Sequence, residues 1–264
     1  MIEVMARRRP DFRVSNVVAV WLRHVTAFRR IWVVDMTAIL MEPLFVLVGV
    51  GFAIGHFVDN ISPGFTYQDF IAPGIIVGNA MFHAIFECSW GAYQRMRTHE
   101  IYDAIIAAPV NVSELAAGEV LWGATRAVMT TAAVLAAAAA LGLIRSPWAV
   151  FVLPVGFLTG LVFGGMGLNF ASTARSSHSL MLVFTMIATP MFFFSGTFFP
   201  VDSLPGWLQP VAWALPLTPA VDAARGFTSG DFGLSQVYAI LYLIGLSALF
   251  YPIATALLRR RLLV

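Results

Sequence analysis

Four ionisable side chains interrupt long apolar stretches of this sequence and are its first candidates for chemistry: Glu42, Glu87, Glu119 and Arg126. Charged groups are costly in hydrocarbon, so inside a membrane they pair with one another or face a water-filled cavity. Arg126 follows Glu119 by seven residues, which places both on one helical face. Two interpretations stay open: a structural ion-pair cluster, or a polar wall that contacts the head group of a substrate. Glu42 precedes Pro43, which should kink its helix, so it can also mark a polar break between subunits.

Metal binding and covalent catalysis find little support in the other polar residues. His83 and Glu87 stand four residues apart, but a zinc site needs three or four ligands. Ser176, Ser177 and Ser195 lack a G-x-S-x-G elbow or a matching His and Asp. We therefore predict no metal site and no catalytic residue.

The elements that must position these charges are membrane spans. Hydrophobic residues make up 59% of the chain and charged residues 11%, less than half of the roughly 25% typical of soluble domains. The chain is therefore an integral membrane protein. Its arginines flank apolar segments instead of forming one polar face, so no nucleic-acid partner is predicted. The single cysteine, Cys88, lies in an apolar run and is expected to be a small core residue.

Six apolar segments are each near the roughly 20 residues needed to cross a bilayer. We place them at residues 32–57, 70–93, 114–143, 148–172, 178–199 and 237–258. The fourth carries Gly156, Gly160 and Gly164, and the third is rich in alanine over residues 132–140. Small residues on one face let helices approach closely, so we expect these two segments to pack tightly against each other or a neighbouring span.

The arginines predict the orientation in the membrane. All 16 cationic side chains are arginines; seven precede the first span, two lie in the 94–113 loop, one is Arg175 and three are residues 259–261. Only Arg145 and Arg225 fall on the other side, and Arg126 lies within a span. By the positive-inside rule both termini are cytoplasmic. We see no signal peptide, because the first apolar run is too long for one.

Residues 1–31 are predicted to form a cytoplasmic N-terminus and an interfacial amphipathic helix. An apolar stripe repeats at helical spacing: Val14, Val17, Val18, Trp21, Leu22, Val25 and Phe28. The remaining surface carries Asn16, Arg23, Arg29 and Arg30, and we expect the arginines to face lipid phosphates. The helix is either a simple anchor or a lever that passes motion from a cytoplasmic partner to the first span.

The loop after the second span is predicted to contain a short amphipathic helix at about residues 98–109. Thr98 can cap its N-terminus, with Glu100 in the first turn. Ile101, Ile105 and Ala108 form its apolar stripe, and Pro109 ends it. Spacing alone does not decide whether this helix has a partner.

Residues 190–225 are as apolar as a span yet hold six prolines. Such a run cannot be one straight helix, and its phenylalanines and tryptophans are too apolar for a loop in water. We predict broken helices that re-enter the outer leaflet, at about residues 200–230, shielded by neighbouring protein.

The order of these parts resembles the ABC-2-type transporter permeases: an interfacial helix, six spans, a long first cytoplasmic loop ending in AAPVNVSEL, and a Pro-rich segment before the last span. Four stretches are similar to the NodJ branch, the permeases of nodulation-factor exporters. They are MEPLFVLVGVGFAIG at 41–55, GEVLWGATRA at 118–127, FFPVDSLP at 198–205 and ALLRRRLL at 256–263.

The resemblance implies an all-α integral membrane protein with the type V ABC exporter fold, in which residues 32–264 form the transmembrane domain. It implies a dimer with a second permease copy, the same chain or a paralogue, in contact through spans one and five. Two separate ABC ATPase subunits would dock on the cytoplasmic face and bind ATP and Mg. The coupling helix would comprise Thr98, His99, Glu100, Ile101, Ile105 and Pro109. The chain has no lysine, so it lacks the P-loop of an ATPase and binds no cofactor itself.

The resemblance also implies export from a bacterial inner membrane. The expected substrate is a lipid-linked oligosaccharide or polysaccharide, whose sugars would cross a polar cleft while its acyl chains stay in the bilayer. Candidate path residues are Glu42, Glu87, Glu119, Arg126, Phe192, Phe198, Phe199 and Trp207. The alternative within this class is efflux of a hydrophobic drug, as in daunorubicin-type exporters. Outside it stand an integral membrane lipid-modifying transferase, which would need acidic or His residues clustered at one face, and a non-transporting scaffold.

Overall fold

The computed structural model describes residues 12–55, 66–231 and 233–263, and within these residues only helices and their connections occur. Six helical stretches are long and apolar enough to cross a membrane. Five are Tyr67–Arg97, Val112–Ala140, Pro147–Thr173, Ser177–Thr197 and Leu234–Leu263; the first begins at Trp32 within α3 (Trp32–Gly55). The six predicted spans are confirmed within a few residues, apart from the first one's end at Phe57, which lies outside the described residues.

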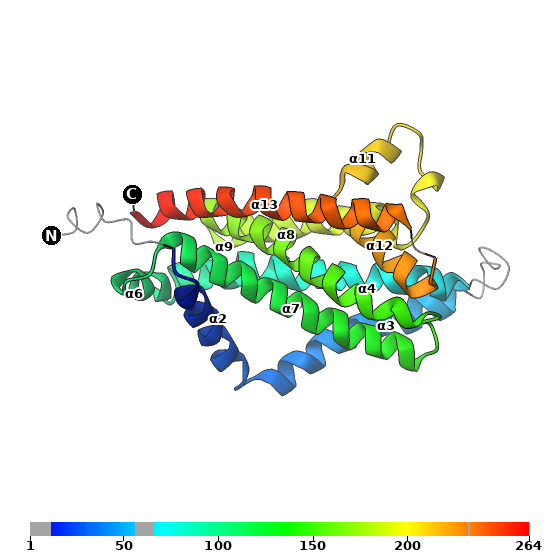
Figure 1. Ribbon diagram of the computed structural model, residues 1–264, viewed down its shortest axis with the longest axis horizontal. Helices are drawn as coiled ribbons and strands as arrows, with labels where there is room; N and C mark the ends of the chain where they lie inside the picture. The colour runs from blue at the N-terminus through cyan, green and yellow to red at the C-terminus, as the bar shows by residue number, and fades with distance from the viewer. Residues whose placement is uncertain (1–11, 56–65, 232, 264) are drawn as a thin grey trace.

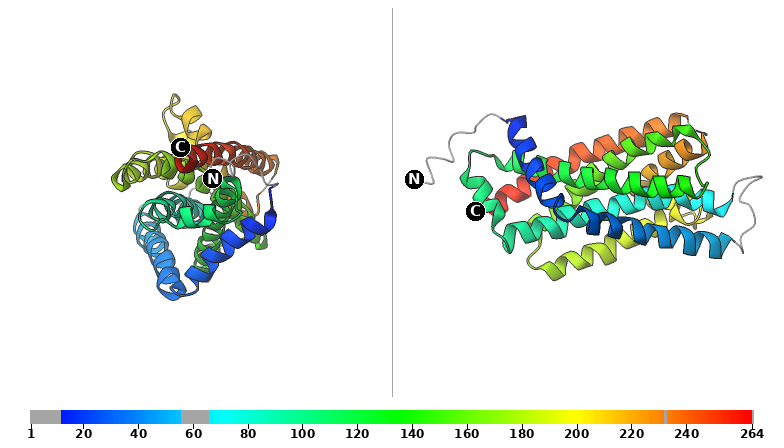
Figure 2. Two further views of the ribbon diagram at one scale, coloured as in Figure 1. Left: turned by 90° about the vertical axis from the view of Figure 1, so that its left-hand side faces the viewer. Right: turned by 90° about the horizontal axis from the view of Figure 1, so that it is seen from below.

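The spans run roughly along the long axis of the molecule (Figure 1). At the centre is α4 (Tyr67–Phe86), where every residue from 69 to 81 is buried. It packs against α7 (Val112–Ala140) and α8 (Val152–Thr173), and α13 (Leu234–Leu263) covers α8. By contrast α3 lies at the edge of the bundle (Figure 2).

Small residues bring α7 and α8 together, as predicted. A Cβ atom on Gly160 would lie 2.5 Å from the Cα of Ala124, and one on Gly156 would overlap Thr131. At Gly164 the nearest neighbours are Cys88 and the backbone of Val120. These contacts place two helix backbones closer than any larger residue permits.

The second and fifth spans are interrupted by wider helical turns. In the second span, α4 passes through η1 (Glu87–Gly91) into α5 (Ala92–Arg97). In the fifth, α9 (Ser177–Val183) passes through η3 (Phe184–Ala188) and α10 (Thr189–Phe192) to η4 (Phe193–Thr197). Such turns insert an extra residue and rotate the side chains that follow.

The proline-rich segment is broken, as its prolines predict. After η4 come η5 (Val201–Ser203), α11 (Gln209–Ala214) and α12 (Leu217–Ser229). The two short helices differ in setting: α11 projects from the bundle (Figure 1), whereas α12 packs against α4 and α13.

The N-terminal helix α2 (Val14–Phe28) meets α3 at a sharp corner and packs on α7 (Figure 1). Its buried residues are Val17, Val20 and His24, whereas Val14, Val18 and Leu22 are exposed. Two polar predictions were wrong. Asn16 and Arg23 do not face outward, because Asn16 donates to Glu114 at 2.7 Å and Arg23 approaches Glu119 at 3.5 Å. Buried carboxylates on α7 draw these side chains inward.

The short loop helix is α6 (Ile101–Ala107), which begins later than predicted. Thr98 does not cap it: its hydroxyl donates to Gln94 in the preceding turn at 2.6 Å. Glu100 stands at the start instead, with a left-handed φ of 50°. The buried residue of α6 is Tyr102, while Ile101 and Ile105 are half-buried and Ala108 is exposed. The predicted stripe is therefore rotated by about one residue.

Candidate functional site

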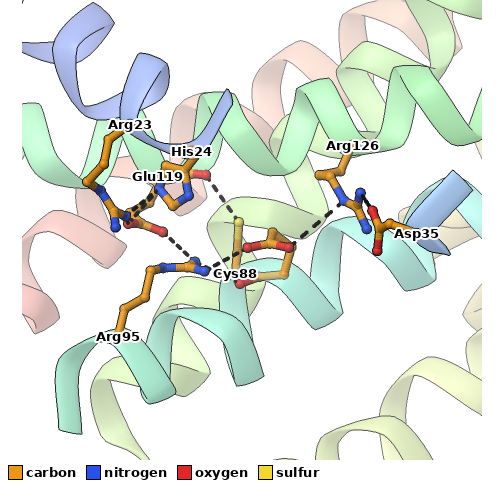
Figure 3. Close-up of polar contacts among 8 residues, drawn as sticks. Arg23, His24, Asp35, Cys88, Arg95, Glu119 and Arg126 are labelled. Atoms are coloured by element: carbon orange, nitrogen blue, oxygen red, sulfur yellow. Dashed lines mark hydrogen bonds and ion pairs between the residues drawn. The ribbon is translucent and has the colours of Figure 1, made fainter. Parts of the chain in front are cut away.

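Four helical elements meet around a cluster of charges near the end of the bundle where α2 and α6 lie (Figure 3). We call it the charge network and define it by seven residues: Arg23, His24, Asp35, Glu87, Arg95, Glu119 and Arg126. They come from α2, α3, the η1–α5 stretch and α7. The network therefore joins the first three spans to the N-terminal helix.

Glu119 is the centre of the network and is fully buried. Its Oε2 accepts a hydrogen bond from Arg95 Nη2 at 2.6 Å. Its Oε1 lies 2.9 Å from His24 Nε2 and 3.5 Å from Arg23 Nη2. The His24 ring also stacks on Trp122, with the ring centroids 5.3 Å apart. Both oxygens are thus occupied, which is what a buried carboxylate needs to remain charged.

Arg95 extends the network back along its own span. Its Nη1 donates to Glu87 Oε1 at 2.7 Å and its Nη2 to the Glu87 carbonyl at 3.1 Å. The two residues are eight positions apart, and the wide turn of η1 lies between them. Gly91 leaves room for the pair, because a Cβ there would lie 2.9 Å from Arg95 Nη1.

Arg126 forms the other end of the network. It donates to Asp35 on α3 and lies 3.9 Å from Glu87 Oε2. Its guanidinium also sits over the Phe28 ring, 5.3 Å from the centroid. Arg126 thereby holds both sides of the corner between α2 and α3.

The network is balanced in charge, with three guanidinium groups facing three carboxylates. Burial lowers the pKa of Arg23 from its ordinary value, and the charge of Glu119 opposes this shift. Next to the network, burial raises the pKa of the Tyr102 hydroxyl well above its ordinary value. Tyr102 is therefore a neutral, fully buried anchor that fixes α6 beside Arg95.

A second contact joins α2 to the far side of α6. Asn16 Nδ2 donates to the Pro109 carbonyl at 3.0 Å and to Glu114 Oε2 at 2.7 Å. Glu114 is also part of the capping box that starts α7, with Asn111 as the N-cap. The connection that follows α6 is thus tied to α2 and to the first turn of α7.

Comparison with known proteins identifies the family. The model of the ABC-2 type transporter family matches residues 15–228. The chain belongs to the ABC-2 type transporter family. The permease is 33% identical over 252 residues to Nodulation protein J of Rhizobium leguminosarum bv. trifolii, covering 94% of each chain. It is 32% identical over 248 residues to Nodulation protein J of Rhizobium meliloti, also at 94% of each. It is 26% identical over 249 residues to the inner membrane transport permease YadH of Escherichia coli, at 92% of this chain and 94% of YadH.

Membership of this family establishes the general class of the protein. The permease is a multi-pass membrane protein and carries no ATPase site of its own, and members of the family pair with ABC ATPase subunits. Its lack of lysine agrees with this, since a P-loop needs that side chain.

The structure brings together three of the predicted polar residues of the permease, Glu87, Glu119 and Arg126. Glu42 lies apart from them, exposed on α3. His83 is half-buried, and no group of three or more metal-ligating side chains occurs among the described residues. Three of the four predicted charges are therefore members of the charge network, whereas Glu42 lies outside it.

The predicted aromatic path residues differ in how far they are buried. The rings of Phe192, Phe193 and Phe198 pack against one another, and Phe82 joins them at 5.3 Å from Phe192. Phe198 and Phe199 are half-buried, while Trp207 is 75% exposed. Trp207 is therefore the most exposed of the four predicted path aromatics, Phe192, Phe198, Phe199 and Trp207.

Sequence reasoning missed four members of the network: Arg23, His24, Asp35 and Arg95. One signal was available, because Arg95 lies only eight residues beyond Glu87, just after the end of the predicted second span. The other three sit on α2 and at the start of α3, whose rotation no local pattern reveals.

Proposed function

We propose that this permease is the membrane subunit of an ATP-driven exporter in a bacterial inner membrane, with both termini in the cytoplasm. Two separate ATPase subunits would bind ATP and Mg and dock on the face that carries α2 and α6. A second permease copy, identical or paralogous, would complete the translocation path. The arginine distribution supports this orientation, because positive side chains stay on the cytoplasmic side.

The observation that carries the proposal is the pairing of buried Glu119 with both α2 and α5. In this mechanism α6 is the coupling helix, and Thr98, His99, Glu100, Ile101, Ile105 and Pro109 form the surface that the ATPases push. Motion of α6 reaches Tyr102 and Arg95, and from Arg95 it reaches Glu119. Because Glu119 is bound to α2, the interfacial helix and the spans move as one unit.

The proposed substrate class rests on the similarity to Nodulation protein J. Similarity to Nodulation protein J over 94% of both chains favours a lipid-linked oligosaccharide or polysaccharide. The broken helices before the last span would re-enter the outer leaflet as a lid. There Trp207 and the half-buried Phe198 and Phe199 would offer flat apolar faces to sugar rings, next to Phe192. Exposed Glu42 on α3 would face the path or the second copy, since lipid is a costly setting for a carboxylate.

A reconstituted complex tests both the class and the substrate. We would co-express the permease with its partner ATPase, purify the complex and measure ATP hydrolysis in proteoliposomes. Addition of an acylated chitooligosaccharide is expected to raise turnover, whereas daunorubicin and the unacylated sugar are not. A stable, active permease that never binds an ATPase would contradict the exporter. Stimulation by daunorubicin alone would replace the oligosaccharide by a hydrophobic drug.

A further inference from the structure

The C-terminal end of α13 borders a groove that the transport mechanism above does not use. The groove has a volume of about 680 Å³ and lies between the first turn of α7 and the last turns of α13. The C-terminal end of α13 lies at the same end of the molecule as α6 (Figure 1). Its walls include Tyr251, Pro252, Ala256 and Leu263, and Arg259 and Arg260 stand at its end.

The three arginines of the C-terminal tail have different tasks. Arg261 turns inward and donates to the Ala174 carbonyl at 2.8 Å and to the Ser172 carbonyl at 3.4 Å, so it caps α8. Arg259 and Arg260 are exposed, and within the described residues neither has a hydrogen bond or an ion pair. Two guanidinium groups are therefore available to a ligand at the mouth of the groove.

Local structure keeps the groove open and positively charged. The Tyr251 hydroxyl donates to the Ser113 carbonyl at 3.0 Å, which ties the two walls together. Pro252 lacks an N–H group and interrupts the hydrogen bonds of α13 at this wall. The carboxylate of Glu114, the residue after Ser113, already accepts hydrogen bonds from the Asn16 side chain and from the N–H groups of Asn111 and Arg13. Among the residues that the structure describes, the groove lining itself contains arginines and no carboxylate.

We propose that this groove binds an anionic phospholipid of the adjacent leaflet. The phosphate would lie between Arg259 and Arg260, and an acyl chain would lie along Pro252, Ala256 and Leu263. An apolar wall that ends in cations fits an amphipathic anion, and basic sites beside membrane helices are typical places for anionic head groups. A soluble phosphate would leave the apolar wall in water, and an acidic protein surface would not fill it.

Native mass spectrometry of the purified full-length permease tests the proposal. Phosphatidylglycerol is expected to be retained in preference to phosphatidylcholine. Each arginine near the surface contributes about fivefold to anionic lipid binding, so Arg259→Gln/Arg260→Gln should weaken retention about 25-fold. The control Arg97→Gln/Arg175→Gln removes the same charge from exposed sites that do not line the groove, and it should retain phosphatidylglycerol. Ala256→Trp, which fills the groove and keeps both charges, should also lose the lipid.

Three outcomes would overturn the proposal. Equal retention by the groove variant and its control would show that only overall charge matters. Displacement of the lipid by millimolar glycerol phosphate would show a head-group anion site without an acyl groove. Loss of ATPase binding with unchanged lipid retention would make Arg259 and Arg260 a docking surface for the partner protein instead.

Discussion

At the residue scale, Glu119 takes part in more ion pairs of the charge network than any other of its side chains. A fully buried carboxylate is tolerated only when cations and donors compensate it, and here Arg95, His24 and Arg23 all do so. The same arrangement makes each partner vulnerable, because removal of one leaves an unpaired charge. The network is therefore a place where single substitutions have large effects.

We expect Arg95→Met to destabilise the permease by about 3 kcal/mol or more, since breaking a buried pair costs more than the pair contributes. The double variant Arg95→Met/Glu119→Met should recover part of this loss, with a coupling of about 1–3 kcal/mol. Thermal unfolding in detergent measures both. Asp103→Asn, an exposed change on α6, serves as the control, and additive losses would argue against direct pairing.

A second prediction concerns the contact between α7 and α8. Gly160→Leu should destabilise the permease by about 1–3 kcal/mol, because its added atoms would enter the Ala124 backbone. Gly245→Ala is the matched control, since a Cβ there meets nothing within 4 Å. The same unfolding assay applies, and equal melting temperatures for the two variants would remove the close-packing argument.

Residues of the network show what the sequence could and could not reveal. The cost of charge in hydrocarbon identified Glu87, Glu119 and Arg126, and helical spacing placed Glu119 and Arg126 on one face of their helix. Their partners His24 and Asp35 could not be found, because they depend on how α2 turns relative to α7. That rotation is set by tertiary packing at Val17 and Val20. The sequence alone does not distinguish these buried valines from Val18, which is exposed.

At the element scale, the proposed function assigns the contact with the ATPases to α6. Ile101→Asp/Ile105→Asp should reduce ATPase co-purification at least about tenfold, because two charges would enter an apolar contact surface. Both side chains are only half-buried in the permease alone, so the spans should remain folded. Thr173→Asp/Ser176→Asp adds the same charge at the same end and should leave binding intact. Unchanged co-purification of the isoleucine variant would remove the coupling assignment.

A guanidinium group from α12 ties the proline-rich segment to α4. Arg225 donates to the Gly196 carbonyl at 2.7 Å and to the Phe70 carbonyl at 3.2 Å, and it lies 3.9 Å from the centroid of the Phe70 ring. These contacts join α12 to η4 and to the first turn of α4. The prolines predicted that this segment would be broken, but no pattern predicted the residue that holds its pieces together.

Arg225→Gln should therefore increase hydrogen exchange at residues 196–208 about tenfold, because local opening no longer breaks a charge-assisted contact. Exchange in α7 should not change. The exposed variant Asp202→Asn is the control. Equal exchange in both variants would mean that residues 196–208 are held by their apolar packing instead.

At the scale of the whole molecule, the charges of the permease gather at its two ends. One end carries the network, α6 and the tail arginines, and the other carries Arg145 paired with Asp69 and Arg225 on Phe70. Hydropathy was enough to predict the six spans, and the arginine count predicts which end faces the cytoplasm. The packing within one chain does not determine its dimer partner or its substrate, because both depend on contacts with other molecules.

The central claim is that the charge network transmits force from the ATPases to the spans. The most direct test is the number of lipid-oligosaccharide molecules exported per ATP hydrolysed, in proteoliposomes containing the complex with Glu119→Gln. This variant keeps the shape of the side chain but weakens its pairing with Arg95 and Arg23. We predict that hydrolysis persists while the transport-to-hydrolysis ratio falls at least about tenfold, the loss expected for one charge-assisted contact. An unchanged ratio in a folded Glu119→Gln complex would contradict the account.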